Sequence, residues 1–369
     1  MKTKCDGCGV KIQTTNPLMP GYIDPDVYIR NPDSFLCQRC YNLKHRNIYQ
    51  ETKIDEKKFY ENIKKINENA LIIYLVDLFD LEGTFVENIN DLFPTQKIIL
   101  VLNKFDLFLS STKVMKLKNY IIEMLKEKNI KVSSVQIISS KKDEDVLRIF
   151  KEILRLRDNS DVYAFGMTNV GKSTFINALT RLTLEKRSDI TISNMPSTTL
   201  DLIKIPLNDK TYLYDMPGII NKHQMTYYLD KETINKVLPK KFIKPKVFQL
   251  NPLQSVFVGG FASISFVSGE KASFVMTFSN ELVIHRTKYE NHLDFYEKHK
   301  DDILLLPNKG ERERLGSIKK EEFFVDGKKD ISISGLGFVT IHGKGKVEVE
   351  TFENIKVSMR ESLVWLEAN

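Results

Sequence analysis

Apolar runs alternate with longer amphipathic stretches through the middle of the chain. The runs at 71–76 and 97–102 are almost wholly apolar and are short enough to be strands buried on both faces. The stretches at about 112–128 and 143–157 read as helices. Strands and helices in alternation are typical of a mostly parallel α/β sheet. We therefore expect an α/β domain over residues 51–220.

The last third of the chain follows a different pattern. Residues 221–236 read as a polar helix, and the stretch 236–246 holds five lysines and no acid. Such an extended basic linker suits contacts with nucleic-acid phosphates, and the alternative is plain solvation. Short alternating runs follow, including a strand expected over 331–341, with one helix between them. This pattern predicts an α+β domain over residues 221–369.

Composition narrows the class of protein. The chain has 369 residues, which suggests two or three domains, and its 42% hydrophobic and 28% charged residues are those of a globular protein. No apolar run approaches the length of a membrane span, so a cytoplasmic location is expected. The net charge of +7 is compatible with an RNA partner.

A phosphate-binding motif follows one predicted strand. Residues 166–173 fit G-x-x-x-x-G-K-[ST] between a strand and a helix. Its two glycines let backbone N–H groups point at one phosphate, and the helix N-terminus adds partial positive charge. Lys172 is expected to reach the β- and γ-phosphates, and Ser173 to bind Mg²⁺. The predicted nucleotide contacts here are Gly166, Thr168, Asn169, Val170, Gly171, Lys172, Ser173 and Thr174.

The elements that select the base lie upstream of this loop. The strand at 97–102 ends in Asn-Lys-Phe-Asp, the N-K-x-D pattern of guanine-specific GTPases. The Asp106 carboxylate can accept hydrogen bonds from guanine N1–H and the amino group, a donor pair that adenine lacks. A second strand, at 135–138, ends in Ser-Ser-Lys, which resembles the S-A-K element behind guanine. Asn103, Asp106 and Ser140 are expected to read guanine, with Lys104, Ser139 and Lys141 beside them.

Two further elements follow the phosphate loop. The segment 196–201 resembles switch I, where Thr199 is the candidate for Mg²⁺ and the γ-phosphate. Residues 215–218 fit the D-x-x-G of switch II, so Asp215 would hold Mg²⁺ through water and the Gly218 N–H would meet the γ-phosphate. Ile219 stands where many GTPases carry a glutamine that orients the attacking water, and slow intrinsic hydrolysis is therefore expected. The predicted catalytic residues are Lys172, Thr199, Gly218 and Asn169.

Asn169 has a more specific interpretation. It matches the G-x-x-N-x-G-K-S pattern of GTPases that use K⁺. In those proteins the asparagine and the switch I backbone hold K⁺ where other GTPases insert an arginine. The alternative is a loop asparagine that tolerates unusual backbone angles.

All four cysteines lie in the first forty residues, as two C-x-x-C pairs. Each pair presents two thiolates on a tight turn, which is the arrangement that tetrahedral Zn²⁺ requires. Disulfides are the alternative, and a cytosolic chain favours zinc. We expect a zinc-binding module over residues 1–50, with the ligands Cys5, Cys8, Cys37 and Cys40.

The five nucleotide motifs stand in an unusual order. The guanine elements precede the phosphate elements. With N-K-x-D as G4, Ser-Ser-Lys as G5, the phosphate loop as G1, switch I as G2 and switch II as G3, the order is G4-G5-G1-G2-G3. A doubly wound sheet tolerates this order because the ligand loops all lie at the carboxyl ends of strands. The sequence therefore predicts a circularly permuted P-loop GTPase domain. Asp77 and Asp80 end its first strand, and the motifs assign them no catalytic role.

With its cysteine pairs, the permuted chain resembles the YqeH family of bacterial GTPases over essentially its whole length. The resemblance implies slow hydrolysis of GTP to GDP, with a role in small (30S) subunit assembly and 16S rRNA maturation. It implies the small subunit or its precursor, rRNA and ribosomal proteins as partners, and a C-terminal domain that binds RNA or protein. The alternative is an RNA- or protein-binding scaffold in which GTP is structural or regulatory.

Overall fold

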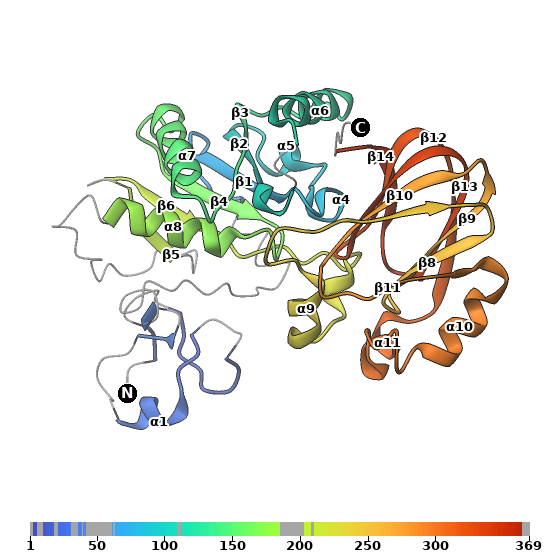
Figure 1. Cartoon of the computed structure of the whole chain (residues 1–369). Helices are drawn as coiled ribbons and strands as arrows, with labels where there is room; N and C mark the ends of the chain where they lie inside the picture. Colours follow the sequence, from blue (N-terminus) through green and yellow to red (C-terminus); the bar gives the residue numbers. More distant parts are fainter. Residues whose placement is uncertain are drawn as a thin grey trace. The chain divides into compact units, whose positions relative to one another are not determined.

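The chain divides into two compact units in the computed structural model (Figure 1). The first unit comprises residues 1–78, 84–105 and 121–220, and the second comprises 79–83, 106–120 and 221–369. A separate zinc module ending at residue 50 stays a prediction. The structure describes residues 3–5, 10–17, 21–30, 36–38, 40–41, 61, 63–108, 112–184, 203–207 and 210–363.

A six-stranded sheet in the order β3-β2-β1-β4-β6-β5 forms the centre of the first unit. All its pairings are parallel except that of β5 with β6. Every residue of β1 is buried, as expected for an apolar strand covered on both faces. The strands are β1 Leu71–Asp77, β2 Lys97–Asn103, β3 Ser134–Ile137, β4 Val162–Gly166, β5 Ile203–Pro206 and β6 Tyr212–Asp215.

The longer helices lie close to where the sequence predicts them. In α7 the residues Val146, Ile149 and Ile153 form a buried stripe at helical spacing, and they join the same apolar core as α8 and the sheet. None of the helices in the described residues is long and apolar enough to cross a membrane. The helices that begin between 81 and 172 are α4 Leu81–Thr84, α5 Ile89–Leu92, η1 Phe105–Leu107, α6 Val114–Glu127, α7 Asp143–Leu156 and α8 Lys172–Leu184. A short helix, α1 Pro25–Arg30, lies near the N-terminus.

The second unit is built on an eight-stranded antiparallel sheet and is richer in strands than the predicted α+β domain suggests. Its longest strands, β12 and β13, pair along their whole length. The strands are β7 Lys246–Leu250, β8 Gln254–Val258, β9 Ala262–Gly269, β10 Ala272–Phe278, β11 Ile284–Lys288, β12 Ile318–Ile333, β13 Gly337–Phe352 and β14 Val357–Glu361. The helices are η2 Met225–Tyr227, α9 Lys231–Val237, η3 Tyr289–Asn291, α10 His292–His299 and α11 Lys309–Leu315.

The single strand expected over 331–341 is wrong, because a turn interrupts it. β12 ends at Ile333 and β13 begins at Gly337. Gly335 has a φ of +76°, and a Cβ there would lie 2.8 Å from the backbone nitrogen of Met225. The apolar and hydroxyl residues on both sides of the turn keep the strand pattern, which hides it in the sequence.

The polar helix expected over 221–236 is also wrong for its first half. Only η2 and α9 are helical there. The backbone N–H of Met225 instead donates to the carbonyl of Ser334, and the carbonyl of His223 accepts from Lys356. This segment therefore satisfies its backbone on the β12–β13 turn and on the residue before β14 rather than within a helix.

The segment 79–83, which follows β1 in the chain, is bonded within the second unit. One carboxylate oxygen of Asp80 accepts from the Gly335 N–H at 2.9 Å and from the Gln224 amide at 2.6 Å. Glu82 forms an ion pair with Arg360 of β14. Burial acts to raise the pKa of Glu82, but the charge of Arg360 and the hydrogen bonds to the carboxylate, from Arg360 among others, together hold this pKa below its ordinary value. These acids anchor the segment, a role that the sequence did not indicate.

Candidate nucleotide-binding site

The phosphate loop has the strand–loop–helix form that the motif requires, since β4 ends at Gly166 and α8 begins at Lys172. A Cβ on Gly166 would lie 2.6 Å from the Leu75 carbonyl oxygen. Gly171 has a φ of +87°, and a Cβ there would lie 2.4 Å from Nδ2 of Asn103. Side chains at these two positions would thus collide with residues of the neighbouring strands β1 and β2, which is why the turn needs glycine.

Asn103, at the end of β2, joins three loops. Its Nδ2 donates to the carbonyl of Val170 in the phosphate loop at 2.9 Å. Its Oδ1 accepts from the backbone N–H and the hydroxyl of Ser140, both at 2.9 Å. The side chain is only 1% exposed. The structure therefore brings the predicted guanine and phosphate elements together at one edge, called here the nucleotide edge, and gives Asn103 a positioning role there.

The loops on either side of Asn103 are fixed in turn. The Ser139 N–H donates to the Asp145 carboxylate at 2.8 Å, at the start of α7. The Phe105 N–H donates to the Ile138 carbonyl at 3.0 Å. Asp106 lies in η1, directly after β2, and its contact with guanine stays a prediction.

Lys104 forms an ion pair with Asp77, an acid to which the sequence motifs assign no role. Its Nζ lies 2.5 Å from Oδ2 of Asp77, which ends β1 and is buried. The two strands are in register so that Asp77 faces Asn103. Lys104 also has a φ of +69°, an unusual value for a non-glycine residue. The sequence offered one signal for this contact. Asp77 is an acid at the end of β1, and β1 pairs with the strand that carries the N-K-x-D motif.

Lys172 and Asp215 bring the phosphate loop and switch II together. Nζ of Lys172 lies 2.8 Å from Oδ1 of Asp215 and also donates to the Met216 carbonyl. Each residue is 1% exposed. The parallel pairing of β4 with β6 places Ala164 opposite Asp215. The strands that lead into the phosphate loop and switch II therefore end side by side. A buried lysine and a buried acid thus compensate each other where phosphate and Mg²⁺ are expected.

Ile219 is fixed to the phosphate loop by its backbone. Its N–H donates to the Gly166 carbonyl at 3.2 Å, and its carbonyl accepts from Thr168 at 2.9 Å. The isoleucine side chain cannot orient water, so here this position serves to attach switch II to the loop. Asn169 has a φ of +66°, which agrees with the structural alternative and leaves the K⁺ interpretation a prediction.

The remaining predicted residues divide between described and undescribed parts of the chain. Ser173 and Thr174 lie in the first turn of α8, and Gly218 is buried. Lys141 follows Ser140 and is exposed. Thr199, with the rest of the predicted switch I, and Cys8 lie outside the described residues.

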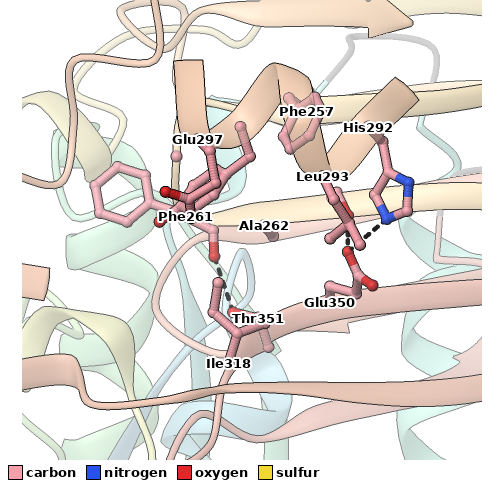
Figure 2. Close-up of a pocket in the computed structure, with 12 residues that line it drawn as sticks. Phe257, Phe261, Ala262, His292, Leu293, Glu297, Ile318, Glu350 and Thr351 are labelled. Carbon is pink, nitrogen blue, oxygen red and sulfur yellow. Dashed lines mark hydrogen bonds and ion pairs between the residues drawn. The ribbon is translucent and has the colours of Figure 1, made fainter. Parts of the chain in front are cut away.

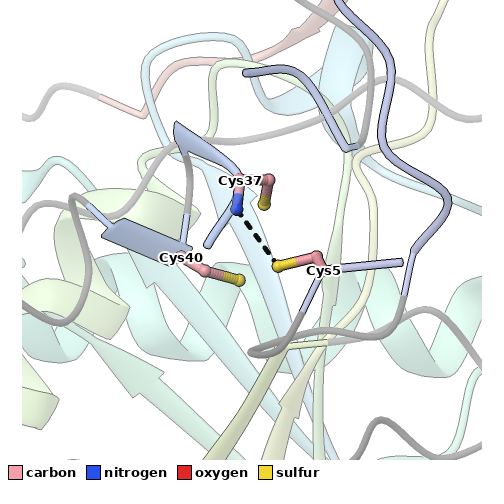
Figure 3. Close-up of side chains that lie close together, drawn as sticks. All are labelled: Cys5, Cys37 and Cys40. Carbon is pink, nitrogen blue, oxygen red and sulfur yellow. Dashed lines mark hydrogen bonds between the residues drawn. The ribbon is translucent and has the colours of Figure 1, made fainter. Parts of the chain in front are cut away.

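Three of the four predicted zinc ligands cluster near the N-terminus (Figure 3). The sulfur atoms of Cys5, Cys37 and Cys40 lie within 4.8 Å of one another, and all three residues are buried. The Cys37 N–H donates to the Cys5 sulfur at 3.1 Å. Sulfur ligands about 2.3 Å from a tetrahedral zinc lie about 3.8 Å apart, so the cluster is compatible with that ion.

The second unit contains a cavity of about 330 Å³ between α10 and the sheet (Figure 2). Phe257 and Phe261 contribute to its lining, and Glu350 accepts there from His292 and Ser263, both at 3.0 Å. Phe257, Phe261 and Phe266 are at most 3% exposed. These phenylalanines therefore belong to the core and do not offer faces on which bases could stack.

Comparison with known proteins gives matches to both units. Residues 271–363 match the model of the YqeH-like C-terminal family, and residues 161–244 match that of the 50S ribosome-binding GTPase family. The uncharacterized protein YqeH of Bacillus subtilis is 38% identical, over 98% of this chain and 100% of that protein. The NO-associated protein 1, chloroplastic/mitochondrial, of Arabidopsis thaliana is 28% identical over 91% of this chain and 69% of its own length. Among solved structures, GNP-bound YlqF of T. maritima matches half of this chain and 66% of that chain, with a TM-score of 0.31 and 18% identity.

Proposed function

Because the chain belongs to the YqeH family of circularly permuted GTPases, we propose that its GTP hydrolysis serves assembly of the small ribosomal subunit. The observation that carries the proposal is the nucleotide edge. Asn103 bonds to Val170 in the phosphate loop and to Ser140 in the loop after β3, although the chain presents these elements in permuted order.

On this proposal the phosphates lie against the backbone of the phosphate loop. Lys172 turns from Asp215 to the β- and γ-phosphates, which keeps its buried charge compensated. Asp215, Ser173 and Thr199 are then available to hold Mg²⁺, which supplies charge neutralisation at the phosphates. The Gly218 N–H meets the γ-phosphate, and Asn169 helps to hold K⁺.

Base selection rests on the loops that Asn103 positions. The Asp106 carboxylate accepts from the guanine N1–H and amino group, and Ser140 lies behind the base. Lys104 lies along the base and is oriented by its ion pair with Asp77.

Zinc is proposed to hold the N-terminal module through Cys5, Cys8, Cys37 and Cys40. Purified chain should carry about one zinc per molecule, and Cys37→Ser should release it while leaving GTP binding intact. A disulfide in freshly purified, metal-free protein would contradict this proposal.

The ribosomal partner is tested by sedimentation of the full-length chain with purified 30S and 50S particles. We expect co-sedimentation with 30S that differs between a non-hydrolysable GTP analogue and GDP. Lys172→Ala should remove the difference between the two nucleotides. Co-sedimentation with 50S alone would overturn the choice of subunit, and a turnover rate that 30S particles leave unchanged would favour the scaffold alternative.

A further inference from the structure

A lysine-rich segment lies between α9 and β7 in the second unit. From residue 233 to residue 269 the chain has no aspartate or glutamate. Lys240, Lys241, Lys244 and Lys246 are exposed, and Phe242 between them is 40% exposed. These five residues are called the basic surface below.

The segment is fixed in place rather than free as a linker would be. Ile243, in the middle of it, is buried and its N–H donates to the Leu107 carbonyl at 3.1 Å. The side-chain amide of Asn280 accepts from the Lys244 N–H and donates to the Phe242 carbonyl, both at 2.9 Å. The buried Ile243 thus turns its neighbours outward, and the backbone that carries them is held before any ligand binds.

The charges of three lysines of this surface are available to a ligand. Within the residues that the structure describes, Lys241, Lys244 and Lys246 form no ion pair, whereas Lys236 pairs with Glu232 at 3.1 Å. Another role for these lysines is to prevent pairing at the exposed edge of a sheet. β7 is the last strand in the sheet order and pairs with β10 on one side. That role explains Lys246 only, because the other lysines precede the strand.

We propose that the basic surface binds single-stranded RNA, with the lysines on successive phosphates and the Phe242 ring under an unpaired base. The alternation of lysines with an exposed aromatic ring favours RNA over an acidic protein, which offers no planar bases to stack. It favours unpaired RNA over a duplex because stacked, paired bases do not expose their faces. The proposal rests on the proposed ribosomal function and assigns a contact site to it.

The test uses the full chain and a fluorescein-labelled oligouridine, with binding followed by fluorescence anisotropy over a range of KCl concentrations. The variant Lys241→Gln/Lys244→Gln/Lys246→Gln should bind more weakly, and the slope of log K against log salt should fall by about 2, since each lost phosphate contact in single strands removes about 0.7. Phe242→Ala should weaken binding about tenfold and leave the salt slope unchanged.

The matched control removes the same charge from exposed lysines elsewhere in the second unit, as Lys298→Gln/Lys309→Gln/Lys356→Gln. It should bind oligouridine like the wild type. Equal loss in both triple variants, or no loss in the first, would overturn the assignment of this surface. Wild-type protein that sediments with 30S particles but does not bind oligouridine would overturn the RNA site and leave the proposed function standing. Failure to sediment with 30S would count against the proposed function itself.

Discussion

The nucleotide edge of the first unit and the basic surface of the second unit both use lysine, in different surroundings. Lys172 and Lys104 lie in buried or partly buried ion pairs with Asp215 and Asp77. The lysines of the basic surface are exposed, and Lys244 has its backbone rather than its side chain held by the protein. A paired, buried charge binds one ligand group in one geometry, and salt changes the strength of that binding little. Exposed charges bind many nucleic-acid sequences, and their binding weakens as the salt concentration rises.

The largest effect is expected at base selection. Asp106→Asn replaces two acceptors with one acceptor and one donor, so preference should move from guanine toward xanthine, whose C2 carbonyl accepts. We expect the ratio of GTP to XTP affinity to fall by about a thousandfold, as two charge-assisted hydrogen bonds imply. Competition binding measures this ratio, and an unchanged preference for GTP would remove Asp106 from the site.

Removal of the phosphate-loop lysine should affect both binding and stability. Lys172→Ala leaves the Asp215 carboxylate buried without its partner, so the free energy of unfolding should fall by about 3–5 kcal/mol and GTP affinity by about a hundredfold. Urea unfolding and nucleotide titration measure the two effects. Lys151→Ala, an exposed lysine of α7, is the control and should change neither.

A second variant separates these two effects. Lys172→Met/Asp215→Leu replaces the ion pair with apolar side chains and should recover most of the stability without restoring GTP binding. Stability that remains as low as in Lys172→Ala would mean that the buried pair is not the cause of the loss.

The Asp77–Lys104 pair allows a smaller test of buried recognition. Asp77→Asn keeps the size of the side chain but removes the charge that orients Lys104, so GTP affinity should fall by about tenfold. The affinity of the protein for oligouridine should be unchanged, because the basic surface does not include this ion pair. The idea fails if Asp77→Asn binds GTP like the wild type.

The smallest expected effect concerns K⁺. Turnover should rise several-fold when Na⁺ is replaced by K⁺ at constant ionic strength, and Asn169→Ala should lose most of that gain. Equal rates in the two salts for the wild-type chain would leave Asn169 with its structural role in the loop.

The sequence predicted the nucleotide edge better than the second unit because each of its elements carries a recognisable motif. The glycines of the phosphate loop and the Asn at the end of β2 belong to such motifs, although their contacts join residues far apart in the chain. The contacts of Asp77 with Lys104 and of Asp80 with Gly335 belong to no motif.

The errors in the second unit have the same origin. The turn at Gly335 lies within a continuous strand pattern, and the segment at Met225 takes its hydrogen bonds from the β12–β13 turn rather than from its own helix. Likewise, the lysines were visible in the sequence, but the buried Ile243 that fixes their position was not distinguishable from the other apolar residues around it.

The most direct test of the central claim is reciprocal linkage between nucleotide and particle. The affinity of the full chain for 30S particles is measured with a non-hydrolysable GTP analogue and with GDP, and the affinity for both nucleotides is measured with and without saturating 30S. If GTP binding serves subunit assembly, the two measurements should give the same coupling factor, and it should differ from one. Nucleotide affinities that 30S particles leave unchanged, together with equal particle affinities in the two nucleotide states, would contradict the account.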